Sequence, residues 1–208
     1  MRTAPFGLIG SGADADTIFK LAAEAAALTH GHPSGYLSAG MVASLVYLLV
    51  DGVSLVGPGA FHGTGAIDRS CGILQAFPGH EETLAAVNCA VALARKGLNQ
   101  HSFLGNETVA VNGPHSHAEA VETLGGGWVG EEALAIALYA VLSARSFVEA
   151  VSIGANHGGD SDSTAAIAGQ LWGAMHGLGG IPHDWITALD VLAPLLHVAR
   201  PFLAVGFR

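Results

Sequence analysis

The sequence GANHGGDSDST, residues 154–164, places two carboxylates and several hydroxyls within five positions, directly after a pair of glycines. An apolar run over residues 165–172 follows, a pattern typical of a loop that leads into a helix. In a continuous helix, residues two apart point to opposite sides, so Asp160 and Asp162 would not share a ligand there. Gly158 and Gly159 permit unusual backbone dihedral angles, and we expect the chain to bend until both carboxylates converge.

The acidic loop has two interpretations. Two carboxylates with a hydroxyl of Ser163 or Thr164 form a site made only of oxygens, which suits Mg²⁺ better than zinc or copper. Alternatively, these residues cap the helix that follows, because Asp, Ser and Thr are preferred there. A cap needs only one side chain, and the two acids would repel each other without a cation or several donors between them. Both features favour the metal site.

Apolar residues at helical spacing continue along the rest of the chain. The run from Ser38 to Val50 is almost wholly apolar and predicts a buried helix. Between Gly52 and Gly79 the pattern breaks down, and no alternating strand pattern competes with the helices. The sequence therefore predicts one all-α domain over residues 1–208. Helices are expected at residues 18–28, 38–50, 81–96, 115–124, 131–142, 147–153, 163–176 and 183–198.

Composition narrows the functional classes. The 208 residues carry a formal net charge of −9 and only eight Lys and Arg, which argues against a nucleic-acid surface. The apolar run at residues 41–50 is shorter than the ~20 residues that span a bilayer, and no signal-peptide pattern follows Met1, so no membrane partner is expected. Cys71 and Cys89 are too few for a disulfide framework. A cytoplasmic protein is predicted.

Acids and aromatic residues elsewhere leave alternatives open. Asp14 and Asp16 repeat the spacing of Asp160 and Asp162, so they either supply a second acidic pair or cap the next helix. Trp128 follows three glycines, where it either stacks on a flat ligand group or anchors the loop in the core. The glycines at 125–127 let backbone amides approach a phosphate, but no strand precedes them, so they are not a dinucleotide fingerprint.

The histidines are weighed in the same way. His30 and His32 precede Pro33, which predicts a non-helical turn whose side chains either face a cleft or hold the turn by hydrogen bonds. No cysteine or third histidine stands at zinc spacing beside them. His157 adjoins the glycine pair and is expected near the acidic loop.

Four segments carry a resemblance to a known family. HGGDSDSTAAIAG, residues 157–169, resembles the carboxy-terminal metal motif of the ADP-ribosylglycohydrolases, and among them the ADP-ribosylarginine hydrolases. THGHPSGYL, residues 29–37, is similar to the family segment at the substrate cleft. MRTAPFG at residues 1–7 and GGGWVGEEAL at residues 125–134 resemble two further family segments, so the likeness covers nearly all of the chain. It implies an orthogonal helical bundle.

The resemblance implies a function and a set of residues. The expected activity is magnesium-dependent hydrolysis of the N-glycosidic bond between ADP-ribose and a modified protein side chain, most closely arginine. Two Mg²⁺ ions would hold the ribose and activate a water. The expected partner is ADP-ribose or an ADP-ribosylated protein. Asp160 and Asp162 are the expected catalytic residues and, with Ser163, the metal ligands. Implied in substrate binding are His30, His32, Gly127, Gly130, His157 and Ser161.

One part of the family pattern has no match. Family members carry an amino-terminal portion whose Thr-Asp-Asp-Thr motif supplies the other half of the two-magnesium site, so the resemblance implies an amino-terminally truncated fold. The chain is then a complete hydrolase, half of a site finished by a complementing amino-terminal polypeptide, or an inactive remnant that binds ADP-ribose or metal. A helical scaffold with a capped loop is the plainest alternative. Apolar surface left uncovered predicts self-association.

Overall fold

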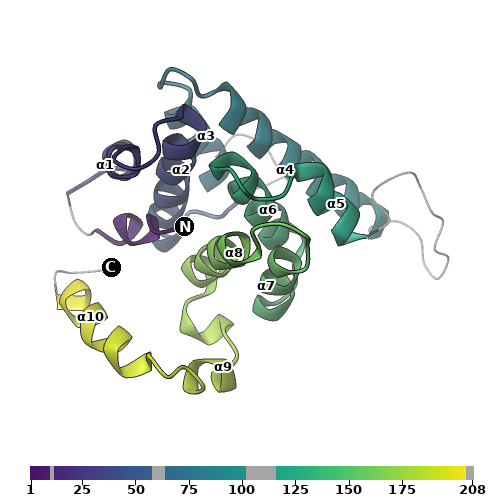
Figure 1. The fold of residues 1–208 in the computed structure, drawn as a ribbon. Coiled ribbons are helices and arrows are strands. Elements are labelled where there is room, and N and C mark those ends of the chain that lie inside the picture. The colour runs from purple at the N-terminus through teal and green to yellow at the C-terminus, as the bar shows by residue number, and fades with distance from the viewer. Residues whose placement is uncertain (10–11, 58–63, 102–115, 205–208) are drawn as a thin grey trace.

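The computed structural model describes residues 1–9, 12–57, 64–101 and 116–204, with the side chains at 97–101 and 201–204 left undescribed. Within these ranges every regular element is helical, which confirms the all-α prediction (Figure 1). The α-helices are α1 (Ala15–Ala27), α2 (Pro33–Val50), α3 (Ala66–Leu74), α4 (Glu81–His101), α5 (His117–Leu124), α6 (Gly130–Ser143), α7 (Phe147–Ala155), α8 (Ser161–His176), α9 (His183–Thr187) and α10 (Leu192–Ala204). Two 3-10 helices are η1 (Ala4–Leu8) and η2 (Leu178–Gly180).

Helices α2 and α6 lie at the centre of the bundle (Figure 1). Every residue from Ala133 to Val141 of α6 is buried, and α2 buries residues on all its sides, as the apolar run predicted. Helix α1 packs on α2, α4 on α6, and α7 and α8 pack on each other and on α6. Each large apolar side chain buried in this centre stabilises the fold by about 1.5–3 kcal/mol. Burial of these two central helices therefore stabilises the arrangement of the helices that pack on them.

Helix α3 was not predicted. Its buried residues Ala66, Ile67, Ser70 and Leu74 follow a helical period, but polar residues and Gly72 interrupt the apolar pattern. The helix begins after Gly65, whose N–H donates a hydrogen bond of 3.2 Å to the Asp68 carboxylate. A local capping contact thus stabilises a helix start that the hydrophobic pattern alone did not reveal.

Several helix boundaries also differ from the prediction. The helix expected over residues 183–198 is divided into α9 and α10, because Pro194 has no N–H and its ring clashes with the carbonyl of the residue four earlier. Pro194 is tolerated in the first turn of α10. Helix α2 begins at Pro33, five residues earlier than predicted. The expected start at His115 lies outside the described residues, and α5 begins at His117 with Ser116 as its N-cap.

By length and composition alone, α2 could cross a membrane, since its 18 residues have a mean hydropathy of 1.4. The sequence analysis considered only uninterrupted apolar runs and therefore expected no segment long enough to span a membrane. Within the structure, 67% of that window is buried, as in the core helix of a bundle.

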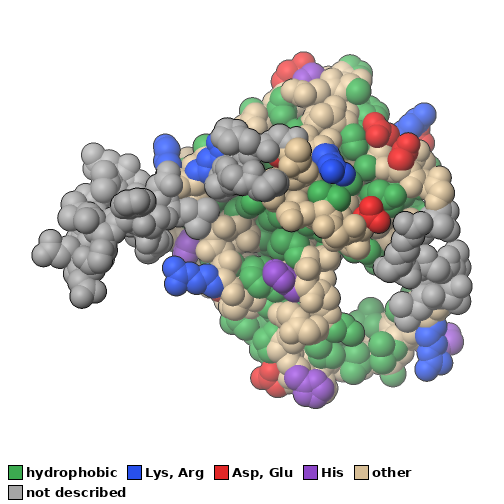
Figure 2. Space-filling view, turned by 180° about the vertical axis from the view of Figure 1, so that it is seen from behind, with side chains coloured by type: hydrophobic (Ala, Val, Ile, Leu, Met, Phe, Trp, Pro, Cys, Tyr) green, Lys and Arg blue, Asp and Glu red, His purple; other side chains and the backbone are tan. Residues whose placement is uncertain are grey.

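The carboxy-terminal helices α9 and α10 form an arm that lies apart from the bundle (Figure 1). In the view from behind, hydrophobic side chains line the arm at the bottom of the molecule (Figure 2). Leu195 and Leu196 of α10 are each 53% exposed, and Val198 is 62% exposed. The arm therefore presents apolar surface to solvent.

Candidate functional site

The acidic loop lies between α7 and α8. Asp160 is the N-cap residue of α8, and its backbone angles (φ −77°, ψ 70°) lie outside the helical region. Asp162 and Ser163 belong to the first helical turn. Residues two apart point to opposite sides only when both are in the helix. Asp160 lies outside the helix, so its side chain and that of Asp162 can point to the same side.

The two carboxyl groups stand at the N-cap and in the first turn of α8, where they interact. The pKa of Asp160 is lowered from its ordinary value, first by hydrogen bonding with the Asp162 carboxyl and next by the Ser163 hydroxyl. His157 adds a smaller attraction. The Ser163 N–H also lowers this pKa, although the Asp160 side chain makes no capping hydrogen bond of ordinary geometry to the helix. Two carboxyls and one hydroxyl thus gather at one end of α8.

Gly159 allows a close approach of two backbone segments. The N–H of Asp160 donates a hydrogen bond of 2.8 Å to the carbonyl oxygen of Gly126. A Cβ on Gly159 would stand 1.7 Å from that same oxygen, so no other residue fits there without movement. Neither Gly158 nor Gly159 has a positive φ angle. The expected reason for these glycines, unusual dihedral angles, is therefore wrong, and close packing replaces it at Gly159.

Thr164 and His157 hold the loop from within. The buried Thr164 hydroxyl donates a hydrogen bond of 2.5 Å to the carbonyl oxygen of Gly154. The Nε2 atom of His157 lies 2.9 Å from the same hydroxyl, and its Nδ1 accepts a hydrogen bond of 3.1 Å from the Gly159 N–H. Both ring nitrogens of His157 are thus engaged within the loop. The Ser161 hydroxyl donates to the His157 carbonyl oxygen at 3.2 Å.

A second loop, residues 125–129, packs against the acidic loop. Gly127 is buried with φ +74°, and a Cβ there would stand 2.8 Å from the Thr164 side chain. The N–H groups of Gly126 and Gly127 donate to the Glu132 carboxylate at 3.1 Å and 3.0 Å. These amides are therefore occupied by Glu132, which sets the shape of the loop that supports Asp160.

The same loop reaches the start of α2. A Cβ on Gly130 would stand 3.1 Å from Gly35 Cα and from the Ser34 carbonyl oxygen, so α6 and α2 begin side by side. Trp128 is 73% exposed and its ring covers Gly126. The alternative in which Trp128 anchors the loop in the core is therefore wrong. The amino-terminal ends of α2, α6 and α8 adjoin this loop, and their dipoles favour a nearby anion.

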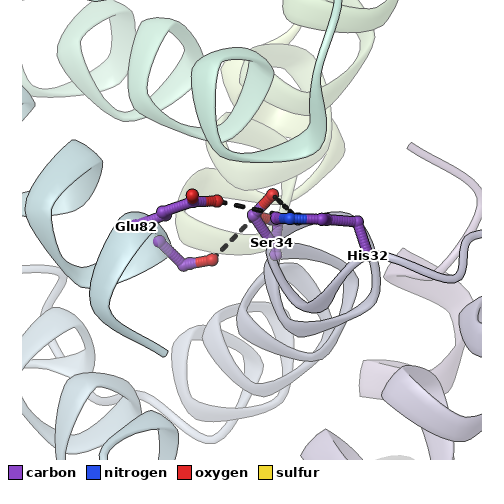
Figure 3. Close-up of polar contacts among 5 residues, drawn as sticks. His32, Ser34 and Glu82 are labelled. Carbon is purple, nitrogen blue, oxygen red and sulfur yellow. Dashed lines mark hydrogen bonds and ion pairs between the residues drawn. The ribbon is translucent and has the colours of Figure 1, made fainter. Parts of the chain in front are cut away.

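The two histidines of the 29–32 segment lie in a non-helical turn, as predicted, and both residues are exposed. His30 Nδ1 lies 2.8 Å from the Thr29 hydroxyl. His32 Nδ1 lies 3.0 Å from the Ser34 hydroxyl and 3.6 Å from the Glu82 carboxylate at the start of α4 (Figure 3). Contacts of exposed charged groups contribute little stability, so His32 links α2 and α4 only weakly.

The first acidic pair serves α1. The Asp14 carboxylate accepts a hydrogen bond of 2.8 Å from the Thr17 N–H, and its pKa is lowered by the hydroxyl and N–H of Thr17. Asp14 is the N-cap of α1, and Asp16 is exposed in the first turn of that helix. This matches the capping interpretation.

The structure brings most of the expected site residues together. His157 and Asp160 lie in the acidic loop, Ser161, Asp162 and Ser163 form the first turn of α8 beside it, and Gly127 packs directly on Thr164 of the same turn. Gly130 connects this cluster to the start of α2, which follows His30 and His32. Sequence reasoning missed Glu132 and Thr164 as supports. Thr164 belongs to the quoted motif, and Glu132 stands near three glycines whose amides need an acceptor.

Comparison with known proteins gives a consistent result. A sequence model described as ADP-ribosylglycohydrolase matches residues 1–205. The ADP-ribosylarginine hydrolase Tri1 of Pseudomonas putida (strain GB-1) is 44% identical over 26% of this chain and 15% of its own length. The ADP-ribosyl-[dinitrogen reductase] glycohydrolase of Rhodospirillum rubrum is 50% identical over 17% of this chain and 12% of its own length.

A longer alignment joins the chain to the mouse ADP-ribosylhydrolase ARH3, at 27% identity over 95% of this chain and 55% of the mouse protein. The chain thus spans about half the length of that relative. No solved structure matches.

Proposed function

Because the chain belongs to the ADP-ribosylglycohydrolase family, we propose that it hydrolyses the N-glycosidic bond between ADP-ribose and a modified protein side chain. Arginine is the proposed side chain, supported by the relatives that are named ADP-ribosylarginine hydrolases. The observation that carries the proposal is the meeting of Asp160, Asp162 and Ser163 at the start of α8. The proposed substrate is an ADP-ribosylated protein.

The donor set at this point fits magnesium. Asp160, Asp162 and Ser163 offer only oxygen atoms, and the lowered pKa of Asp160 extends its ionised range toward more acidic pH. Mg²⁺ usually keeps several waters and takes one or two carboxylates from a protein, so a hydrated ion suits two carboxyls and a hydroxyl. When bound, the ion supplies Lewis-acid assistance and lowers the pKa of an attacking water.

The other residues of the cluster shape and present the substrate site. His157 and Thr164 hold the acidic loop, and Glu132 holds the glycine loop that supports it. The helix starts around these loops favour the diphosphate of ADP-ribose. The exposed Trp128 ring offers a face on which adenine stacks, and His30 lies at the edge of this region.

A second candidate function is binding without turnover, or a half-site that another polypeptide completes. The favouring observation is that no group of three or more His, Cys, Asp or Glu side chains in the described ranges is placed to hold a metal ion. A cytoplasmic setting remains our proposal, and Cys71 and Cys89 are both free thiols.

The deciding experiment measures ADP-ribose release from ADP-ribosylarginine with and without Mg²⁺. Release should require Mg²⁺ and be lost in Asp160→Ala and Asp162→Ala, while Asp14→Ser, which removes an acid but keeps a capping oxygen, should retain it. ADP-ribose binding without release would support the second candidate. If the folded chain neither released nor bound ADP-ribose, that result would contradict both candidate functions.

A further inference from the structure

The hydrogen bonds of the His157 ring have directions that determine where the ring carries its proton. The N–H of Gly159 lies 3.1 Å from the Nδ1 atom of His157. A backbone N–H can only donate, so Nδ1 accepts this bond and carries no proton. Neutral imidazole has one donor nitrogen and one acceptor nitrogen, whereas the charged ring has two donors. The Gly159 contact therefore leaves one form, the neutral ring with its proton on Nε2.

The Thr164 hydroxyl leads to the same form. It lies 2.9 Å from the Nε2 atom of His157. It also faces three carbonyl oxygens, those of Gly154, Asp160 and Ser161, at 2.5 Å, 3.1 Å and 3.2 Å. A hydroxyl has one proton, and a carbonyl oxygen can only accept. The Thr164 proton goes to a carbonyl, of which that of Gly154 is nearest, so the Thr164 oxygen accepts the Nε2–H of His157.

Together these bonds form a chain with one direction. Gly159 donates to His157, His157 donates to Thr164, and Thr164 donates to Gly154 in the last turn of α7. The chain begins at a backbone N–H and ends at a backbone carbonyl, so none of its bonds can be reversed. Thr164 is fully buried, where hydrogen bonds are stronger than in water.

The two ring contacts bracket the residues expected to hold the metal. Gly159 directly precedes Asp160, and Thr164 directly follows Ser163. The His157 ring therefore joins the two ends of the ligand segment. Residues that orient metal ligands from outside the coordination sphere act through such contacts. The ring limits how far Asp160 and Ser163 can move apart.

The same contacts leave the ring without a free nitrogen. A general base needs an acceptor nitrogen within reach of the proton that it removes, and a substrate-binding ring needs a free donor or acceptor. His157 is half-buried, its Nδ1 is occupied by Gly159 and its Nε2 by Thr164. This arrangement suits a residue that holds other groups in place.

We propose that His157 is a positioning residue of the hydrolase site, held as the neutral imidazole with its proton on Nε2. Its ring sets the spacing of Asp160 and Ser163, and with it the affinity for Mg²⁺. This inference rests on the proposed function, because it assigns His157 a role in the same site. It replaces the direct substrate contact expected for His157 and gives the ring no part in proton transfer.

Nuclear magnetic resonance of the isotopically labelled full chain tests the ring form. The histidine signals that disappear in His157→Asn should show Nδ1 as the unprotonated nitrogen and Nε2 as the protonated one. The Gly159 N–H should exchange with solvent faster in His157→Ala than in the unaltered chain. His157→Asn should keep the slower exchange, because an asparagine oxygen can accept from the N–H two residues later.

Calorimetric titration with Mg²⁺ tests the positioning role. His157→Ala should weaken Mg²⁺ binding by about 10- to 100-fold, the usual effect of losing a residue that orients metal ligands. His157→Asn keeps only the Gly159 contact and should fall between His157→Ala and the unaltered chain. His183→Ala removes an exposed histidine from α9 and should leave the affinity unchanged. Release of ADP-ribose by His157→Ala should recover at saturating Mg²⁺, which the loss of a catalytic base would not allow.

Three results overturn the proposal: a proton on Nδ1, an unchanged Mg²⁺ affinity in folded His157→Ala, or a variant that stays inactive at saturating Mg²⁺ while the unaltered chain is active. If His157→Ala does not fold, an unchanged Mg²⁺ affinity in His157→Asn overturns it. If the unaltered chain does not bind Mg²⁺, the proposed function and the positioning role fail together. If the unaltered chain binds Mg²⁺ and His157→Ala binds it equally well, the positioning role alone fails.

Discussion

The carbonyl oxygen of Gly126 accepts the N–H of Asp160 at 2.8 Å, and this bond joins the glycine loop before α6 to the acidic loop before α8. The two residues are far apart in sequence, yet the bond determines where the first carboxylate of the motif stands. It also places Gly159 directly against Gly126. The geometry of the acid pair therefore depends on a contact that the motif itself does not contain.

Gly159→Ala should disrupt this contact. The added Cβ would stand 1.7 Å from the Gly126 oxygen, so the two loops must separate, at a cost of about 1–3 kcal/mol in the free energy of unfolding. Urea unfolding measures this cost. Gly158→Ala is the matched control, since no atom lies within 4 Å of its Cβ position and its φ is not positive. Equal stability of the two variants would contradict the close packing.

Glu132→Ala should loosen the glycine loop. The variant removes a carboxylate that accepts from Gly126 and Gly127 and leaves two amides without their acceptor, which should lower the free energy of unfolding by about 2 kcal/mol. Glu132→Gln keeps an acceptor oxygen and should lose less stability than Glu132→Ala.

Glu131→Gln is the control at the neighbouring position. The Glu131 Oε2 atom is buried without a partner, so neutralising this side chain should leave the stability unchanged or increase it. Thermal unfolding of these variants checks the expected order of stabilities. A greater loss of stability in Glu131→Gln than in Glu132→Ala would contradict the prediction.

The sequence predicts the fold where the hydrophobic pattern is dense. Helices α2 and α6 follow from long apolar runs, and the start of α8 follows from polar residues behind glycines. Helix α3 does not follow, since Asp68, Arg69 and Gly72 interrupt its apolar period. The break before α10 is a steric effect of Pro194, which a periodicity analysis does not weigh.

The candidate site divides in the same way. The acid pair is visible because its residues are adjacent in sequence and chemically unusual. Its supports are not visible, because Gly126 meets the acidic loop only after the chain has folded, and sequence spacing contains no record of that contact. Trp128 shows the same limit, since only the structure decides between an exposed ring and a core anchor.

The exposed side of α10 predicts self-association. Leu195 and Leu196 are each 53% exposed on a helix whose described charged side chain is Arg200, within a chain of net charge −9. A second copy that covers α10 would remove this apolar surface from water. Light scattering should show a dimer that Leu195→Ser with Leu196→Ser converts to a monomer. Leu28→Ser, at a residue 86% exposed beyond α1, should leave the dimer intact, and a monomeric unaltered chain would refute the prediction.

Asp162→Ala should raise the pKa of Asp160. Hydrogen bonding with the Asp162 carboxyl is the largest cause of the lowered pKa of Asp160. Removing it leaves the Ser163 hydroxyl as the main remaining cause, so the value should rise without reaching the ordinary one. If the two carboxyls only repelled each other, the same variant would lower the pKa instead. Carbon-detected titration of the side-chain carboxyls distinguishes the two signs.

Asp14 serves as the internal control for that titration, since its pKa is lowered by Thr17 and should be the same in both proteins. The lowered pKa of Asp160 also determines how the stability of the fold depends on pH. A depressed folded pKa stabilises the fold above the unfolded value, near 4, and the contribution is lost as the pH falls through the folded value. Asp162→Ala should therefore narrow the acidic range over which ionised Asp160 favours the folded state.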